Sequence, residues 1–402
     1  MIPRKEYFDK LIGYRDKKLI KVITGVRRCG KSTLLKLFQE HLLETGVAET
    51  QIISINFEEY EFVDLLEPKS LHRYIKERMS KDKMTYLFLD EIQNVKEFQK
   101  VVDSYFVKEN VDIYMTGSNA YMLSGELATL LSGRYVKIEM LPFSFQEYLL
   151  CQEGEASIEV IYKKYIESSS FPYAINLDVD SGQVKEYLTG IYDTIILKDV
   201  IARKKISDVM MLESVTRFLM DNIGNQLSTK KISDTMTSDG RQINVRTVES
   251  YVSAFMNSYI IYQAKRYDIR GKQYLKTLEK YYVVDIGLRN VMLGNMGRDI
   301  GRVLENVIYL ELIRRGYEVY IGKIDDVEID FVAKDMSGIK YIQVAASVRD
   351  EETLKRELRP LQKIQDHYPK CILTLDMDPI TDYDGIRKIN ALEYLVHKVD
   401  IY

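Results

Sequence analysis

Cysteine is scarce in this 402-residue chain, and the few cysteines lie far apart. Cys29, Cys151 and Cys371 form no metal-binding or redox spacing, and free thiols fit a reducing cytosol. The chain also lacks an apolar run of membrane-spanning length, and its first residues do not resemble a signal peptide. We therefore expect a cytoplasmic protein with no membrane partner.

An excess of charge is missing as well. The 57 Lys and Arg residues and the 60 Asp and Glu residues leave a net charge of −3. No global field therefore draws the protein to nucleic acid or to a membrane, and any such contact must be a local patch. The length favours two or three domains, and a hydrophobic content of 46% lets each domain bury a core.

Two glycines, Gly25 and Gly30, occur at the spacing of a phosphate-binding loop. Residues 25–32 match the phosphate-binding pattern G-x-x-x-x-G-K-[ST] without a mismatch. Residues 19–24 before them are typical of a buried strand, and residues 33–43 after them are typical of a helix, which is the context that this pattern requires. The expected ATP contacts are Gly25, Val26, Arg27, Arg28, Cys29, Gly30, Lys31, Ser32 and Thr33. Arg27 and Arg28 could equally be solvated side chains.

Two acids follow a second apolar segment. Residues 86–89 predict a buried strand that delivers Asp90 and Glu91 to its carboxyl end. Asp90 and the Ser32 hydroxyl are expected to hold Mg²⁺, while Lys31 reaches the β- and γ-phosphates. Glu91 is placed to polarise the attacking water as a general base.

Further strands are expected at residues 51–57, 111–119 and 135–140, with a helix over 95–108; the strand at 111–119 ends in small polar residues. Alternation of strands and helices predicts a parallel sheet with helices on both faces. Ligands of such sheets bind at the carboxyl ends of the strands. We expect all the motifs, including Arg134 just before the last strand, to lie on that side of the sheet.

The middle of the chain has a different pattern. Helices are expected at residues 212–222, 228–236 and 245–256, followed by β-rich runs at 260–264 and 280–284 with a turn at 270–272. Three helices and a hairpin predict a winged helix-turn-helix. Residues 225–285 hold ten Lys or Arg and six Asp or Glu, and the candidate DNA contacts are Arg241, Arg246, Lys265, Arg266, Arg270 and Lys272. The alternative is a winged helix that acts only as a packing module.

The C-terminal part begins with an amphipathic helix over residues 301–316, and short strands carrying acids follow it. This order resembles the PD-(D/E)XK nuclease core, in which a helix Glu, a strand Asp and a later Glu-x-Lys hold metal and activate water. Glu305 and Asp330 match the first two positions, but Gln343 and Ala345 replace the third acid and the lysine. We expect a degenerate, vestigial nuclease site without cleavage. In the alternative, Glu305 and Asp330 are structural residues.

With these marks together, the chain resembles the bacterial and archaeal AAA-like P-loop ATPases that carry a C-terminal nuclease-like domain of unknown function. The marks include residues 25–32, 89–91, 116–118, 132–134, 141–145, 280–282, 285–289, 304–306, 328–331 and 342–344. The resemblance implies binding and hydrolysis of ATP.

In AAA-type ATPases a polar residue after the fourth strand senses the γ-phosphate, and Thr116, Ser118 and Asn119 are the candidates here. A plain turn with a helix cap is the alternative. An arginine at the position of Arg134 completes the site of a neighbouring subunit, which implies a homo-oligomer; the alternative is a surface arginine paired with a local carboxylate.

The expected fold is an α/β, AAA-like P-loop NTPase core at residues 1–150, a helical linker and winged helix at 151–290, and a degenerate nuclease-like α/β domain at 291–402. The expected function is Mg²⁺-dependent ATP hydrolysis, catalysed by Lys31, Glu91 and Arg134, that controls double-stranded-DNA-associated downstream domains. The alternative is a slow ATP-dependent switch that recruits a protein partner, with the downstream domains purely structural.

Overall fold

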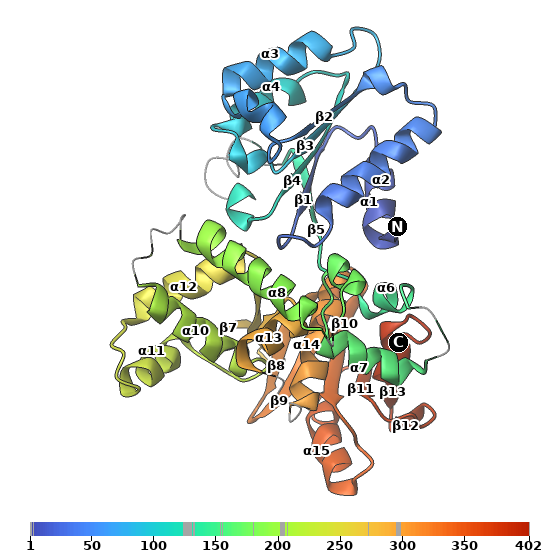
Figure 1. Cartoon of the computed structure of the whole chain (residues 1–402). Helices are drawn as coiled ribbons and strands as arrows, with labels where there is room; N and C mark the ends of the chain where they lie inside the picture. The colour runs from blue at the N-terminus through green and yellow to red at the C-terminus, as the bar shows by residue number, and fades with distance from the viewer. Residues whose placement is uncertain are drawn as a thin grey trace. The chain divides into compact units, whose positions relative to one another are not determined.

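The computed structural model describes residues 2, 4–123, 131, 133–152, 154, 156–179, 181–201, 206, 208–271, 273–294 and 299–401. It contains two compact units (Figure 1). The first unit consists of Met1–Pro142 and Asn257–Tyr259, and the second consists of Phe143–Met256 and Ile260–Tyr402. Among the described residues, no helix has both the length and the apolar composition needed to cross a membrane.

The first unit is built on a five-stranded parallel sheet with the strand order β2-β3-β4-β1-β5. Its strands are β1 (Ile20–Thr24), β2 (Ile52–Asn56), β3 (Thr85–Asp90), β4 (Val111–Gly117) and β5 (Tyr135–Glu139). Its α-helices are α1 (Lys5–Tyr14), α2 (Lys31–Glu44), α3 (Pro68–Arg78) and α4 (Phe98–Phe106). Short 3₁₀ turns are η1 (Glu49–Gln51), η2 (Tyr60–Leu66), η3 (Ile92–Asn94) and η4 (Ala120–Leu123). The expected parallel α/β core is confirmed.

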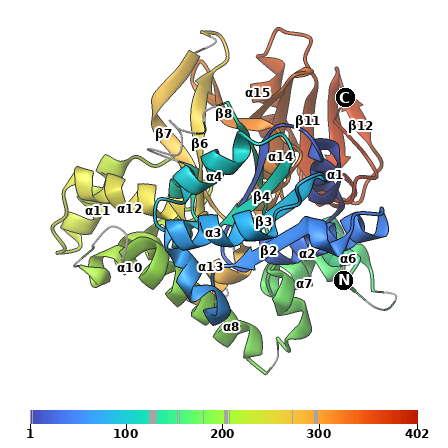
Figure 2. The ribbon, with the colours of Figure 1, turned by 90° about the horizontal axis from the view of Figure 1, so that it is seen from above.

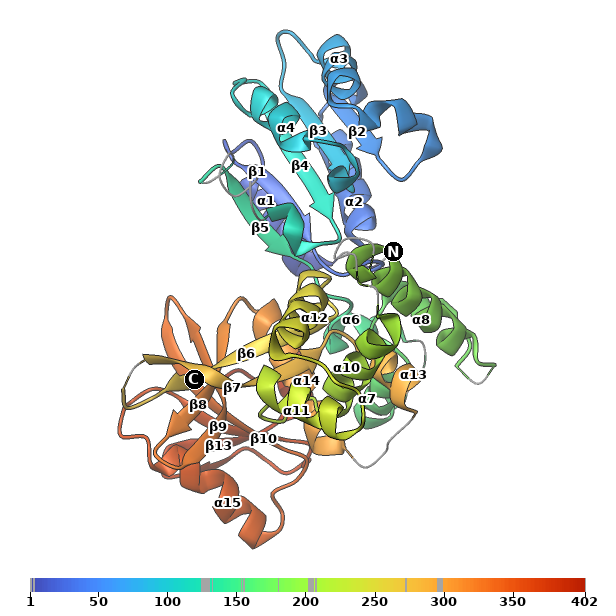
Figure 3. The same cartoon turned by 90° about the vertical axis from the view of Figure 1, so that its left-hand side faces the viewer.

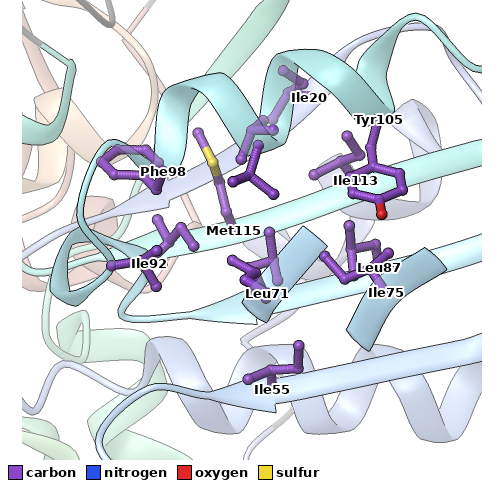
Figure 4. Packing of buried hydrophobic residues seen from close by; sticks show 14 of the residues in the cluster. Ile20, Ile55, Leu71, Ile75, Leu87, Ile92, Phe98, Tyr105, Ile113 and Met115 are labelled. Carbon is purple, nitrogen blue, oxygen red and sulfur yellow. The ribbon is translucent and has the colours of Figure 1, made fainter. Parts of the chain in front are cut away.

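Helices cover both faces of this sheet, with α1 and α2 on one face and α3 and α4 on the other (Figure 1). Figure 4 shows the second interface, where Leu71 of α3 and Tyr105 of α4 pack onto Leu87 and Ile113 of the central strands. Burying each such side chain stabilises the fold by about 1.5–3 kcal/mol. Because both faces are covered, the central strands β1, β3 and β4 are buried along their whole length, as expected for a parallel sheet.

One charged residue interrupts the apolar strand β1. Lys21 is fully buried, and its ammonium group pairs with the Asp112 carboxylate on the neighbouring strand β4. The Tyr114 hydroxyl also donates to Asp112, at 2.8 Å. A buried charge is tolerated when it is paired and hydrogen-bonded in this way.

The expected helix over residues 95–108 is shorter, because residues 92–94 form the 3₁₀ turn η3 and α4 begins only at Phe98. Glu91, the residue after β3, has a left-handed backbone at φ 55° and turns the chain into η3. This early turn keeps the residues after Glu91 beside the carboxyl ends of the strands.

The second unit holds an eight-stranded sheet with the order β12-β13-β11-β10-β9-β8-β6-β7. Its strands are β6 (Ile261–Asp268), β7 (Gln273–Val283), β8 (Glu318–Ile324), β9 (Val327–Asp335), β10 (Gly338–Ala345), β11 (Lys370–Thr374), β12 (Thr381–Tyr383) and β13 (Ile386–Asn390). The described helices of this unit are α6 (Phe145–Leu149), α7 (Ile158–Glu167), η5 (Pro172–Asn176), α8 (Gln183–Thr194), the π-helix η6 (Ile195–Ile201), α10 (Val209–Asp221), α11 (Thr229–Ser238), α12 (Val245–Asn257), α13 (Ile286–Leu293), α14 (Ile300–Arg314), α15 (Glu351–Gln362) and α16 (Ala391–Leu395).

The hairpin β6–β7 lies at one edge of this sheet, and β12 lies at the other (Figure 2). The helices α10, α11 and α12 form at the predicted positions within about three residues and gather near the hairpin (Figure 3). The hairpin expected to be a wing is, however, joined to the C-terminal sheet, because β6 pairs in parallel with β8. The expected boundary at 290/291 thus falls inside the second unit, and the winged-helix assignment stays a prediction.

Residues 285–287 lie very close to residues 168–170 of an earlier segment. The buried Asp285 carboxylate caps α13 and accepts hydrogen bonds from Ser169 Oγ at 3.2 Å and from Ser170 N at 2.7 Å. A Cβ atom at Gly287 would lie 1.8 Å from the Ser168 carbonyl oxygen. Only glycine therefore allows the segment before η5 to reach the start of α13.

Candidate nucleotide-binding site

The phosphate-binding loop joins β1 to α2, and its two glycines have conformations that other residues rarely adopt. Gly25 has φ 146°, and a Cβ atom there would lie 2.1 Å from the Met140 carbonyl oxygen. Gly30 has φ 103° and forms the N-cap of α2. The loop therefore leads into a helix N-terminus, whose unpaired N–H groups and positive end of the dipole favour a phosphate.

Lys31 is buried at the start of α2, with 4% of its surface exposed. Its ammonium nitrogen donates to the carbonyl oxygens of Gly25 and Val26, both at 3.1 Å, and lies 3.8 Å from Glu91 Oε1. The charge is thus held mainly by neutral carbonyl groups of the loop itself. Such an ammonium group can bind an anion more strongly than it binds these carbonyls.

Sequence reasoning missed Arg4, which braces this loop. The buried guanidinium donates to the carbonyl oxygens of Cys29 at 2.9 Å, Leu141 at 2.6 Å and Pro142 at 3.3 Å. It thereby ties the loop to the segment that follows β5. A lone arginine near the start of the chain carries no pattern that could have revealed this role.

Asp90 ends β3 beside β4 and is mostly buried. Its Oδ1 accepts a hydrogen bond from the Thr116 hydroxyl, which also accepts one from Glu91 N at 2.9 Å. Burial raises the pKa of Asp90, while hydrogen bonds from Ser32 and Thr116 work against that rise. The Ser32 hydroxyl and the Asp90 carboxylate therefore lie together, and these oxygen donors fit Mg²⁺, which prefers hard oxygen ligands.

Glu91 lies beside them with 7% of its surface exposed. Burial raises its pKa, but the positive charge of Lys31 and the hydrogen bond from Gln93 outweigh that effect, so the pKa lies below its usual value. The Ser118 hydroxyl donates to Glu91 Oε2 at 3.1 Å. An ionised carboxylate next to a phosphate-binding lysine is suited to accept a proton from water.

The three polar residues at the carboxyl end of β4 and just after it have different contacts. Thr116 binds Asp90, Ser118 binds Glu91, and Asn119 Oδ1 accepts from the Tyr121 backbone at 2.7 Å, which caps the turn η4. Within the described ranges, Asn119 Nδ2 is buried without a hydrogen-bond partner. The choice between a phosphate sensor and a plain turn therefore stays a prediction.

Two loop arginines and Thr33 complete the expected ATP contacts. Arg27 pairs with Glu58 at 3.1 Å, and Arg28 is exposed in a left-handed conformation at φ 65°. Thr33, in the first turn of α2, is exposed. Val26 and Cys29 are fully buried, so they can contribute only their backbone groups to a ligand.

The expected position of Arg134 is wrong. All five strands run in the same direction, so the residue before β5 lies at the amino edge of the sheet, where the Arg134 carbonyl accepts from Ile20 N at 2.8 Å. The phosphate loop follows the other end of β1. The Arg134 guanidinium pairs with Asp103 of α4 and lies over the Phe106 ring.

In the second unit, Lys280 of β7 brings Glu305 and Asp330 together. Its buried ammonium group lies 2.9 Å from Glu305 Oε1, 2.7 Å from Glu328 Oε1 and 3.5 Å from Asp330 Oδ1. Burial raises the pKa of Asp330 to about 7. Among the described residues, no three His, Cys, Asp or Glu side chains are arranged to hold a metal ion. Lys280 supplies the cation, and the sequence pattern did not indicate it.

Gln343 has a structural part in the same region. Its Oε1 accepts from Asp330 N at 2.7 Å, and its Nε2 donates to Glu357 Oε2 at 2.9 Å. The ladder between β9 and β10 ends at the pair Phe331–Ile342, so the Gln343 side chain satisfies the next backbone N–H. A glutamine can do this with both its acceptor and its donor, whereas a carboxylate cannot donate.

The candidate DNA contacts are only partly available. Arg241 donates to Ser214 Oγ at 2.7 Å, and Arg270 pairs with Asp325 at 2.6 Å. Arg266 is half-buried, while Arg246 and Lys265 are exposed. Lys272 lies outside the described residues.

Comparison with known proteins agrees with this geometry. An AAA domain family matches residues 17–149, and a family described as a domain of unknown function matches residues 160–299. An uncharacterized protein of Haemophilus influenzae is 40% identical over 400 residues, which cover 98% of this chain and 99% of that protein. An uncharacterized protein of Methanocaldococcus jannaschii is 30% identical over 410 residues, covering 95% of this chain and 87% of that protein.

Among solved structures, the Walker-type ATPase of Pyrococcus abyssi has a similar fold. The TM-score is 0.51 at 14% sequence identity, and the match covers 73% of this chain and 96% of that chain. At this identity the likeness concerns the fold alone.

Proposed function

This chain belongs to the family of P-loop ATPases with an AAA domain, and from that premise we propose that it hydrolyses ATP with Mg²⁺. The observation that carries the proposal is the grouping of Lys31, Asp90 and Glu91 beside a glycine loop in which Gly25 has no room for a Cβ atom. A structural ion pair would need neither the strained loop nor the second carboxylate.

Each residue of the site has a proposed task. The loop N–H groups and Lys31 bind the phosphates, and Ser32 and Asp90 hold the metal. Bound Mg²⁺ supplies positive charge that offsets the charge developing on the phosphate oxygens. Glu91 takes the proton from the attacking water, and Thr116 fixes Asp90 in place through its hydroxyl.

We propose that the nucleotide cycle acts on the second unit and that double-stranded DNA is its target. The exposed side chains of Arg246 on α12 and Lys265 on β6 support this, because both can reach the phosphate oxygens of DNA. Both also lie within residues 225–285, where Lys and Arg outnumber Asp and Glu. Nuclease cleavage is not part of the proposal, because Lys280 supplies the cation of the acid cluster.

The test is steady-state ATP hydrolysis by wild type, Glu91→Gln and Lys31→Ala, each with and without double-stranded DNA at low salt. We expect Glu91→Gln to bind ATP but to turn over at least about 100-fold more slowly, because it has lost the general base. Lys31→Ala should lose ATP affinity. Glu77→Gln, an exposed change on α3, is the matched control.

The DNA arm decides between the two classes of target. Stimulation by DNA that falls with salt and is lost in the double variant Arg246→Ala and Lys265→Ala supports DNA. A turnover rate that does not change with DNA instead favours the switch that recruits a protein partner. In that case, the Glu91→Gln variant would stay in the ATP-bound state and retain the partner. Equal turnover by wild type and Glu91→Gln would overturn the role of Glu91 as general base, and a wild type without turnover would overturn the ATPase itself.

A further inference from the structure

The carboxylate of Glu91 is held from one side by two hydrogen-bond donors. Gln93 Nε2 and Ser118 Oγ both donate to Glu91 Oε2, the second at 3.1 Å. The two donors also contact each other, at 3.5 Å between Gln93 Nε2 and Ser118 Oγ. The other oxygen, Glu91 Oε1, faces Lys31 at 3.8 Å. One oxygen is therefore fixed, and the other points toward the phosphate-binding side.

The local backbone brings Gln93 back to the acid that it follows. The left-handed Glu91 starts the turn η3, in which Asn94 N donates to Glu91 O at 3.1 Å. The neighbouring strand leaves space for the side chain, because a Cβ atom at Gly117 would lie 2.8 Å from Gln93 Oε1. Gln93 Oε1 itself is buried with no hydrogen-bond partner among the described residues. The hydrogen bonds of this side chain are therefore made by its amide nitrogen, which is the donor to Glu91.

We propose that Gln93 and Ser118 form a clamp that positions Glu91 for proton transfer, an inference that rests on the proposed ATPase function. The clamp holds Oε2 and leaves Oε1 to face the water. In the step, that water's oxygen bonds to the γ-phosphorus while the bond from phosphorus to the bridging oxygen breaks, which releases ADP. The water's proton passes to Glu91 Oε1. Gln93 touches none of the reacting atoms and is a positioning residue.

The experiment measures kcat, KM and the affinity for a fluorescent N-methylanthraniloyl ATP in Gln93→Met, Ser118→Ala and the double variant. Methionine keeps the length of glutamine and removes the donor. We expect kcat to fall about 10–100-fold with each single change, because a misplaced general base loses part of its contribution to the rate. The affinity for nucleotide should stay within about threefold of the wild-type value. The double variant should lose little more than either single variant, since both donors serve one oxygen.

Gln39→Met, a half-buried change on α2, is the matched control and should keep the wild-type kcat. A wild-type kcat in Gln93→Met and in Ser118→Ala would overturn the clamp and leave the ATPase standing. A loss of nucleotide affinity as large as the loss of kcat would also overturn it, because the residues would then shape the pocket instead of the base. A wild type without turnover would overturn the proposed function and the clamp together.

Discussion

Lys31 and Lys280 are both buried lysines, 4% and 3% exposed, but their ammonium groups meet different partners. Lys31 donates to two neutral carbonyls and has one carboxylate at 3.8 Å, so much of its charge is left for a ligand. Lys280 is surrounded by three carboxylates, which neutralise its charge, so it does not attract a further anion. Burial lowers the pKa of Lys280, but those carboxylates outweigh it and hold the pKa above its usual value. The two lysines therefore differ in their partners and not in their burial, which supports the proposed binding role of Lys31.

Replacing Lys280 by methionine should destabilise the second unit by about 3–5 kcal/mol at pH 8, because buried carboxylates are left without their cation. Burial already raises the pKa of Asp330 to about 7, above its unfolded value, and loss of the Lys280 charge raises it further. The folded variant then binds more protons, so its stability rises as the pH falls. Thermal unfolding at pH 5 and pH 8 measures both effects.

The matched control for this prediction is Lys323→Met, a half-buried change on β8 of the same sheet. It should leave the unfolding temperature near that of wild type. A Lys280→Met protein that is as stable as wild type at pH 8, or that loses stability on acidification, would contradict the structural reading of the cluster.

At the scale of elements, two glycines set how closely segments approach. Gly25 lets the phosphate loop pass the chain after β5, and Gly287 lets residues 168–170 reach the start of α13. The first contact shapes the nucleotide site, whereas the second fastens α13 to the segment before η5 through Asp285. Neither glycine could be replaced without moving a backbone carbonyl.

We expect Gly287→Ala to cost about 3 kcal/mol or more, since the new methyl group would meet a carbonyl oxygen at 1.8 Å that no rotamer change can relieve. Gly301→Ala is the matched control on α14, where a Cβ atom meets nothing within 4 Å. There, alanine should be neutral or stabilising by up to about 1 kcal/mol, because it favours the helix. Thermal unfolding compares the two, and an equal effect would refute the explanation.

At the scale of the whole molecule, Arg134 cannot serve the nucleotide site of its own sheet. It lies at the amino edge, whereas Lys31 and Glu91 lie at the carboxyl edge. Any action on a nucleotide therefore needs a second copy of the chain. The contact with Asp103 is half-exposed and worth at most about 1 kcal/mol, so it does not prevent such a role.

If Arg134 acts across copies, Arg134→Ala should lower turnover by about 10³-fold, as expected for an arginine that stabilises the transition state. Mixing it with Glu91→Gln should restore measurable turnover, because the second protein supplies the arginine and the first supplies the glutamate. Arg78→Ala, an exposed change on α3, is the control. Full activity of Arg134→Ala alone, or no recovery of turnover on mixing, would contradict a role for Arg134 at the nucleotide of a second copy.

Local residue pattern was enough to predict the parallel core and the residues of the candidate nucleotide site. The glycine loop, the strand before it and the acids at 90 and 91 each follow from short-range conformational rules, so the parallel core and the grouping of Lys31, Ser32 and Asp90 could be predicted. The helices α10, α11 and α12 were predictable for the same reason, since their apolar residues repeat at the helical period.

Contacts between distant segments needed the tertiary structure. Strand direction decided that Arg134 lies opposite the loop, and pairing of β6 with β8 decided that the hairpin joins the C-terminal sheet. The contacts of Arg4, Gln93 and Lys280 could not be predicted from the sequence, because the partners of Arg4 and Lys280 are remote in the chain and Gln93 depends on space left by Gly117. The sequence by itself determined the glycine loop and the acids on which the proposed chemistry rests, and the fold decided which residues brace the loop, since packing alone brings these groups together.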